Sequence, residues 1–162
     1  MLIIGKKGRE IAGTEIKEAI EELNEGYALE WAGAYYYSLA ANLVAGIQAP
    51  IYIKLFKEHA EEGIVHANKL ADRVVQLGGE PIRDLAELEK KADMKVILPK
   101  DLTDIKGFLR ALIEIERKAI EFYQRLAQRT HNKDLVTHEL AEDLLENEVH
   151  DEEELENLIG GE

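Results

Sequence analysis

The chain divides into four long stretches in which apolar side chains recur at alternating steps of three and four residues. This spacing places side chains on one face of an α-helix. The stretches cover about residues 14–46, 49–77, 103–129 and 134–159, and Thr14 is expected to cap the first one. No segment shows the two-residue alternation that is typical of β-strands. The sequence therefore predicts an all-α protein built from four long helices.

The segments between these stretches indicate how the helices connect. The first two helices are separated by a short gap and the last two by a tight turn at residues 130–133, so each pair should form an antiparallel hairpin. Residues 80–101 form a long connector, within which 81–91 are predicted to be a short helix. Residues 1–13 are expected to be an N-terminal tail. A length of 162 residues fits one domain over residues 1–162.

Charge and composition restrict the function. The chain carries 20 Lys and Arg against 33 Asp and Glu, a formal net charge of −13. Such a charge argues against direct DNA binding, because phosphates require neutralising Lys and Arg, and it suits a protein that handles cations. The absence of Cys excludes disulfides, iron–sulfur clusters and thiolate zinc sites. No stretch reads as an export signal or a membrane span, so we expect a soluble, cytoplasmic protein without a membrane partner.

Each apolar stripe is interrupted near its middle by a group that does not belong in an apolar core. The interrupting residues are Glu30, His66, Glu116, and the pair Glu148 and Asp151. One buried carboxylate without a partner costs several kcal/mol. Antiparallel packing brings the four midpoints together, and no Lys or Arg occupies the neighbouring stripe positions. The sequence therefore predicts metal ions between these side chains, and mixed carboxylate and imidazole ligands suit iron, manganese or zinc.

The segments that carry these residues resemble the helices of ferritin-like di-iron proteins. The similarity extends over residues 29–37, 66–73, 76–81, 114–123 and 145–158, with bacterioferritins and archaeal Dps-like proteins as the most similar branch. The resemblance implies a ferritin-like four-helix bundle, with two helix hairpins joined by a long connector that contains a short helix. In that family two irons are held by one Glu from each of two helices and by a Glu-x-x-His pair from each of the other two.

The resemblance also implies an activity. We expect Fe(II) to be oxidised by O₂ or H₂O₂ at a di-metal centre inside the subunit, for iron storage, detoxification and protection from oxidative stress. Glu62 and Glu148 would bridge the metals, with Glu30, Glu116 and His66 as terminal ligands. A homo-oligomer is expected, and a 12-subunit cage is one possible form. Haem is not expected, because neither of the two methionines lies on the second helix, where bacterioferritins carry the axial ligand.

The second helix departs from the family pattern. Counting back three residues from His66, the expected Glu is replaced by Gly63, and Glu62 lies one position earlier. Glu62 can still reach the same face, because residues four apart on a helix are neighbours. His59 lies seven residues before His66 and shares that face as well.

The fourth helix departs too. The stripe places Glu148 and Asp151 at the paired positions, so that Asp151 stands where the family has His. The nearby His150 lies about 100° away around an ideal helix. In a second possible register Glu146 and His150 repeat the spacing of the second helix, and a π-bulge would turn them inward. Glu148 is favoured over Glu146, and His150 is kept as a candidate ligand.

Two further interpretations remain open at this point. The departures are also compatible with a degenerate centre, in which the protein is a non-catalytic ferritin-like scaffold or sequesters a single metal ion.

His131 and His138, at the turn before the fourth helix, are interpreted as ordinary surface residues.

Overall fold

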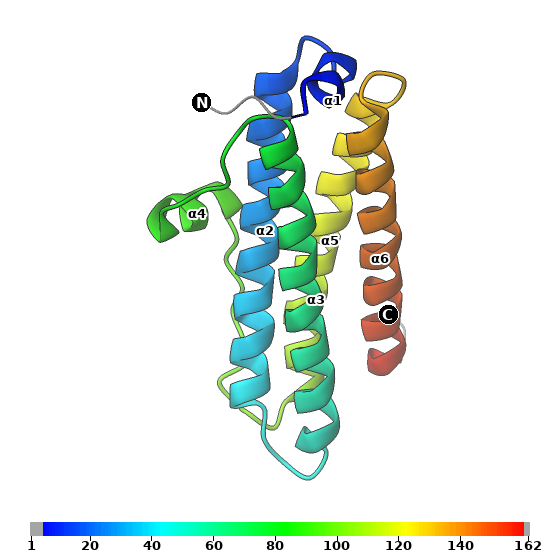
Figure 1. Cartoon of the computed structure of the whole chain (residues 1–162). Helices are drawn as coiled ribbons and strands as arrows, with labels where there is room; N and C mark the ends of the chain where they lie inside the picture. The colour runs from blue at the N-terminus through cyan, green and yellow to red at the C-terminus, as the bar shows by residue number, and fades with distance from the viewer. Residues whose placement is uncertain (1–4, 161–162) are drawn as a thin grey trace.

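The computed structural model describes residues 5–160, and this part of the chain is helical with no β-strand. Of the described helices, four are long and two are short. The long ones lie side by side, and the short ones lie outside them (Figure 1). The helices are α1 (Lys6–Ile11), α2 (Ile16–Leu43), α3 (Ala49–Gln76), α4 (Leu85–Ala92), α5 (Ile105–Thr130) and α6 (Leu135–Ile159). None of the described helices is long and apolar enough to cross a membrane. The predicted four-helix bundle is confirmed.

The connections produce two hairpins and one long crossing. A short loop links α2 to α3, and the turn at residues 131–134 links α5 to α6. Between the hairpins the chain runs back along α2, with α4 projecting from the side of the bundle (Figure 1). This crossing returns the chain to the other end of the bundle before α5 begins. As a result α3 and α5 run in one direction, and α2 and α6 in the other.

Side-chain caps mark where several of the helices begin. Three helices start after an aspartate whose side chain accepts a hydrogen bond from a backbone N–H three residues further on, namely Asp84, Asp104 and Asp134. The predicted cap at Thr14 is wrong, because α2 begins after Glu15 and no side chain caps it. The expected tail contains α1, and its residues 1–4 lie outside the described part of the chain.

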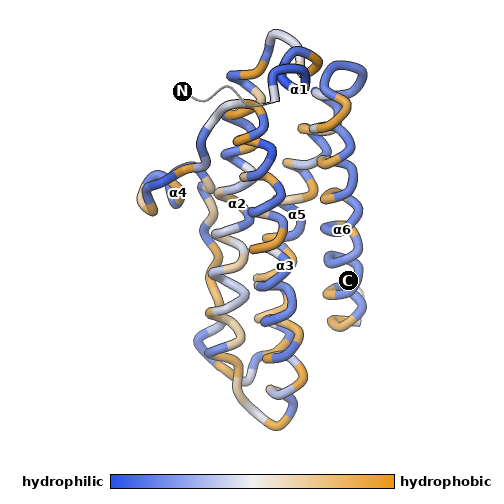
Figure 2. Tube along the Cα trace, viewed as in Figure 1, coloured by the Kyte–Doolittle hydropathy of each residue, from blue (hydrophilic) through white to orange (hydrophobic). Residues whose placement is uncertain are grey.

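The apolar core consists of two clusters, one towards each end of the bundle. One includes Leu23, Leu70, Phe122, Leu126 and Leu144, and the other includes Phe56, Phe108, Leu112 and Leu155. Figure 2 shows hydrophobic and hydrophilic residues interleaved along every long helix, as expected when one face is buried and the other is in water. The polar interruptions of the four stripes lie between the two clusters.

A buried ion pair fixes the turn between α5 and α6 to α3. The Arg73 guanidinium lies 2.9 Å from Oδ1 of Asp134 and donates a second hydrogen bond, also 2.9 Å long, to Thr137 Oγ1. Burial by itself raises the pKa of Asp134. Hydrogen bonds from Thr137 and the charge of Arg73 outweigh this effect, so the pKa lies below its ordinary value. The turn is therefore held in one position by charged groups that are almost fully buried.

Candidate metal centre

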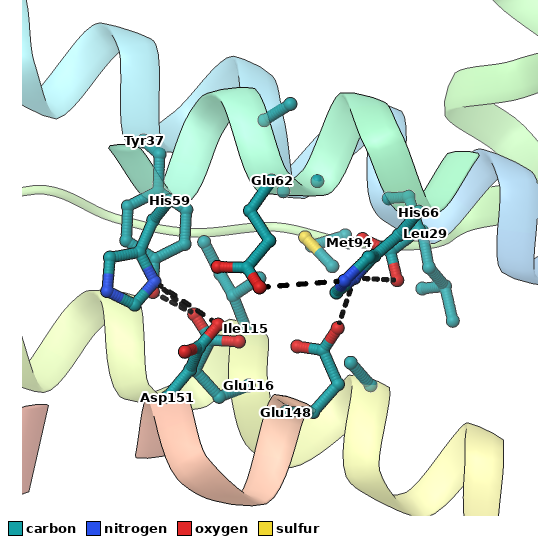
Figure 3. A pocket seen from close by; sticks show the side chains of 15 residues that line it. Leu29, Tyr37, His59, Glu62, His66, Met94, Ile115, Glu116, Glu148 and Asp151 are labelled. Carbon is teal, nitrogen blue, oxygen red and sulfur yellow. Dashed lines mark hydrogen bonds and ion pairs between the residues drawn. The ribbon is translucent and has the colours of Figure 1, made fainter. Parts of the chain in front are cut away.

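Acidic and imidazole side chains from all four long helices converge between the two apolar clusters (Figure 3). They are Glu30 from α2; His59, Glu62 and His66 from α3; Glu116 from α5; and Glu148 and Asp151 from α6. All of them except Glu62 are buried. They line a cavity of about 20 Å³, and none of the described residues that line it is Lys or Arg. Lys and Arg therefore do not balance the charge of these carboxylates.

The first group of ligating atoms belongs to Glu30, His66 and Glu148. Nδ1 of His66 lies 2.8 Å from Oε1 of Glu148 and 3.6 Å from Oε1 of Glu30. One atom from each of the three side chains lies within 4.8 Å of the other two. Two carboxylates and one imidazole at this spacing can hold one divalent cation.

The second group belongs to His59, Glu116 and Asp151. Nδ1 of His59 lies 3.5 Å from Oδ2 of Asp151 and 3.8 Å from Oε1 of Glu116. These three side chains are also buried, and their ligating atoms meet the same 4.8 Å limit. The centre thus has two positions of similar composition, each with two carboxylates and one imidazole.

Glu62 lies between the two positions. Its side chain is 41% exposed, and Oε1 lies 3.7 Å from Nε2 of His66. Figure 3 shows its carboxylate pointing into the space between His59 and His66. A carboxylate has two oxygens, so Glu62 can contribute to both positions, and its partial exposure connects the centre with solvent.

Two tyrosines hold the glutamates of the opposite hairpin. The hydroxyl of Tyr37 on α2 donates to Glu116 on α5, and the hydroxyl of Tyr123 on α5 donates to Glu30 on α2. Each tyrosine follows the glutamate of its own helix by seven residues, so the two hydrogen bonds are related by an approximate twofold repeat. These bonds orient both carboxylates and link the hairpins across the centre.

Glu116, Glu148 and Asp151 retain protons more strongly than ordinary carboxylates do, because the pKa of each is raised. Burial is the main cause of the raised pKa of Glu148, and the charge of Glu30 adds to it. Burial likewise raises the pKa of Glu116, with a further contribution from Glu148. For Asp151, burial raises the pKa to about 6 even though His59 acts in the opposite direction. A cation that binds here must displace protons, so metal binding and proton release are coupled.

His66 also holds its proton more strongly than usual. Burial alone lowers the pKa of His66, because it disfavours the charged ring. The carboxylates of Glu30 and Glu62 outweigh this effect and raise the pKa above its ordinary value. The ring therefore carries positive charge over a wider pH range, which partly offsets the repulsion between the carboxylates.

The structure decides between the two registers that the sequence left open for α6. Glu148 and Asp151 are buried in the centre, whereas Glu146 and His150 are exposed. The helix is α-helical from Leu135 to Ile159 without a π-bulge. His150 is thus not brought to the centre, because a regular helix points it about 100° away from the stripe.

His59 of α3 is part of the centre. The sequence analysis placed it only on the same helix face as His66. A Cβ at Gly63 would lie 3.3 Å from the backbone oxygen of Glu30 and 3.5 Å from Cβ of Ala34. The absence of a side chain thus permits a close approach of α3 to α2. His59 lies one turn before Gly63, and its imidazole completes the second position.

Comparisons with known proteins agree with this architecture. Residues 20–161 match the Ferritin family, which is described as a ferritin-like domain. The DNA protection during starvation protein of Pyrococcus furiosus is 30% identical over 153 residues, which cover 94% of this chain and 82% of that protein.

Two solved structures extend the comparison. The bacterioferritin-related protein of Bacteroides fragilis, described as a dodecameric thioferritin, has a TM-score of 0.86 at 31% identity, covering 94% of this chain and 91% of its own. An archaeal Dps homologue from Halobacterium salinarum has a TM-score of 0.81 at 22% identity, covering 90% of this chain and 81% of its own. The second likeness concerns the fold alone.

Proposed function

This chain belongs to the ferritin-like domain family, and from that premise we propose that it stores and detoxifies iron by oxidising Fe(II) at the buried carboxylate and histidine centre. The observation that carries the proposal is the pair of three-ligand positions with Glu62 between them. Two positions so close together allow two Fe(II) ions, the substrate, to be held side by side.

The chemistry follows from having two one-electron donors in one site. Each Fe(II) gives up one electron, so a pair supplies the two electrons that convert H₂O₂ and two protons into two waters. With O₂ as the oxidant, the same two electrons and two protons give H₂O₂. Taking both electrons together avoids a one-electron step that releases radicals.

The side chains of the centre support this use. Glu30, His66 and Glu148 bind one ion, and His59, Glu116 and Asp151 bind the other. Carboxylate oxygens are hard ligands that stabilise the ferric product. The raised pKa values of the buried carboxylates mean that protons leave these groups as the cations arrive.

We further propose that the chain assembles into a homo-oligomeric cage. The related Bacteroides fragilis protein is described as dodecameric and matches over nearly the whole chain. A shell of twelve subunits would give the oxidised iron an enclosed space. Light scattering or analytical ultracentrifugation of the purified protein measures its mass, and a monomer would contradict this part of the proposal.

An anaerobic Fe(II) titration, followed by O₂ or H₂O₂, tests the proposed activity. We expect saturation near two irons per chain and rapid oxidation. Glu148→Gln should slow oxidation at least tenfold, because it removes a buried ligand. Glu146→Gln is the matched control on the same helix; its side chain is exposed, and its rate should equal that of the wild type.

The competing function is sequestration of a metal without turnover. The observation that favours it is Gly63, which leaves α3 without the carboxylate that the resemblance implies at that position. Saturation at one metal per chain, with oxidation no faster than in buffer, would support sequestration and overturn the oxidase.

A further inference from the structure

The imidazole ring of His59 has carboxylates on both sides. Its Nδ1 faces the centre and lies 3.5 Å from Oδ2 of Asp151 and 3.8 Å from Oε1 of Glu116. Its Nε2 faces the other way and lies 3.3 Å from Oε2 of Glu154 on α6. Glu154 follows Asp151 by three residues, so these two carboxylates lie on the same face of α6. The ring is therefore held between two acids that are one helical turn apart.

Glu154 differs from the glutamates on either side of it along α6. Glu152 and Glu156 accept hydrogen bonds from Arg117 of α5, whereas Glu154 contacts α3 through His59. The side chain of Glu154 is 45% exposed and that of His59 only 4%. The contact therefore joins a buried ring to a carboxylate at the edge of the bundle, where water still solvates its charge.

The contact with Glu154 determines which nitrogen of His59 carries a hydrogen. An ionised carboxylate can only accept a hydrogen bond, so the hydrogen lies on Nε2. The neutral ring then has its lone pair on Nδ1, which is the atom that faces Asp151 and Glu116. A metal-binding histidine commonly donates its other N–H to a carboxylate, and this bond fixes both the tautomer and the orientation of the ring.

A second contact fixes the plane of the ring but not its direction. The ring of Tyr37 is stacked on that of His59, with centroids 4.9 Å apart and planes inclined by 15°. Stacking allows a half-turn about the Cβ–Cγ bond, which would turn Cδ2 instead of Nδ1 towards the centre. The half-turn would also present Cε1 to Glu154 and break the hydrogen bond. Glu154 therefore selects the orientation in which a nitrogen faces the centre.

We propose that Glu154 is a positioning residue for metal binding at the second position of the centre. Its carboxylate accepts the Nε2–H of His59 and so directs the lone pair of Nδ1 towards the ion. Glu154 acts on the ion only through His59. The inference rests on the proposed function, because it takes His59 as a ligand of one of the two ions.

Isothermal titration of the metal-free protein with Mn²⁺ tests this role. In Glu154→Ala, one of the two ions expected per chain should bind about tenfold more weakly than in the wild type, and the other with unchanged affinity. Glu154→Gln keeps an oxygen that can accept the N–H, so both affinities should stay within about threefold of the wild type. Glu153→Ala removes an exposed neighbour on the same helix and should match the wild type.

Two results of the titration would overturn the proposal. One is equal affinity for both ions in Glu154→Ala and the wild type. The other is binding by Glu154→Gln that is as weak as that of Glu154→Ala, because the negative charge and not the hydrogen bond would then be responsible.

The orientation of the His59 ring in the metal-free protein provides a readout that needs no metal. Atomic-resolution crystal structures should show one orientation in the wild type, with Nε2 towards Glu154, and two orientations in Glu154→Ala. The same single orientation in both proteins would overturn the positioning role. Fewer than two Mn²⁺ ions in the wild type, together with the expected difference in orientation, would contradict the proposed oxidation centre and still support control of the ring by Glu154.

Discussion

Replacing Asp151 by Asn should stabilise the metal-free protein at neutral pH. The pKa of Asp151 is raised from 3.8 to about 6, chiefly by burial. A shift of that size corresponds to about 3 kcal/mol, at 1.36 kcal/mol per pKa unit. Solvent screening of this side chain reduces the figure to about 1.5 kcal/mol. Asn has nearly the same shape but never ionises, so the variant avoids this cost.

The pH dependence has a definite sign. Because the folded-state pKa is raised, the stability linked to this group is fully present below about pH 4 and is lost as the pH rises through about 6. The free energies of unfolding of wild type and Asp151→Asn should therefore converge below about pH 4. They should differ by about 1.5 kcal/mol at pH 7, with the variant more stable.

A divalent cation should reverse the order of stability at pH 7. Mn²⁺ at about one hundred times its dissociation constant adds about 2.7 kcal/mol per site to the wild type, and the variant has lost a ligand of one site. Thermal unfolding with EDTA or with Mn²⁺ measures both differences, and 1 kcal/mol moves the midpoint by about 2–4 °C. Glu153→Gln, exposed on the same helix, should change either midpoint by less than about 2 °C.

The reasoning fails if Asp151→Asn is less stable than the wild type at pH 7 in EDTA. That result would mean that the 3.5 Å contact of Asp151 with His59 is a stabilising ion pair that needs no metal. Unchanged stabilisation of the variant by Mn²⁺ would remove Asp151 from the ligand set.

Three further outcomes are expected. Tyr123→Phe removes the hydroxyl that donates to Glu30 and should weaken Mn²⁺ binding about tenfold by titration calorimetry, whereas Tyr35→Phe, at an exposed ring, should leave it unchanged. Asp134→Asn breaks a buried ion pair and should cost about 3 kcal/mol in urea unfolding at pH 7. Because the pKa of Asp134 is lowered, its stabilising effect is present above the ordinary aspartate range and is lost as the pH falls through the lowered value, so wild type and variant should converge in acid. Gly26→Ala would place a Cβ 2.6 Å from a buried phenylalanine ring and should lower the free energy of unfolding by about 1–3 kcal/mol; an unchanged urea midpoint would show that the ring moves freely.

The fold could be predicted because its signals are local and repeated. Apolar steps of three and four residues mark each helix, and a single long connector is compatible with few arrangements of four helices. The same periodicity placed Glu148 on the inner face of α6 and Glu146 on the outer face, as the structure has them. Convergence of the buried acids was predictable, since antiparallel packing brings stripe midpoints together. Their role as metal ligands stays a proposal.

Other features depend on contacts between different helices, which the apolar pattern of a single helix does not predict. The contribution of His59 depends on Glu116 of α5 and Asp151 of α6, which lie 3.8 and 3.5 Å from its Nδ1 and are distant from it in the sequence. The pairing of His131 with His138 depends on the path of a turn and on a buried arginine from another hairpin. Each depends on contacts between segments that are distant in the sequence.

The hydrogen bonds from Tyr37 to Glu116 and from Tyr123 to Glu30 join the two hairpins, so they affect how the hairpins separate during partial unfolding. Most close packing lies within α2–α3 and within α5–α6, so each hairpin is the more cohesive unit. Between the hairpins lie the buried carboxylates of the centre, and the charge of Glu30 acts on Glu148 across this layer. We therefore expect the hairpins to separate along this layer. In the metal-free protein, backbone amide hydrogens that face the layer should exchange with solvent before those inside each hairpin. Under the proposed function, a bound ion would add to the two tyrosine hydrogen bonds that join the hairpins and would slow their partial separation.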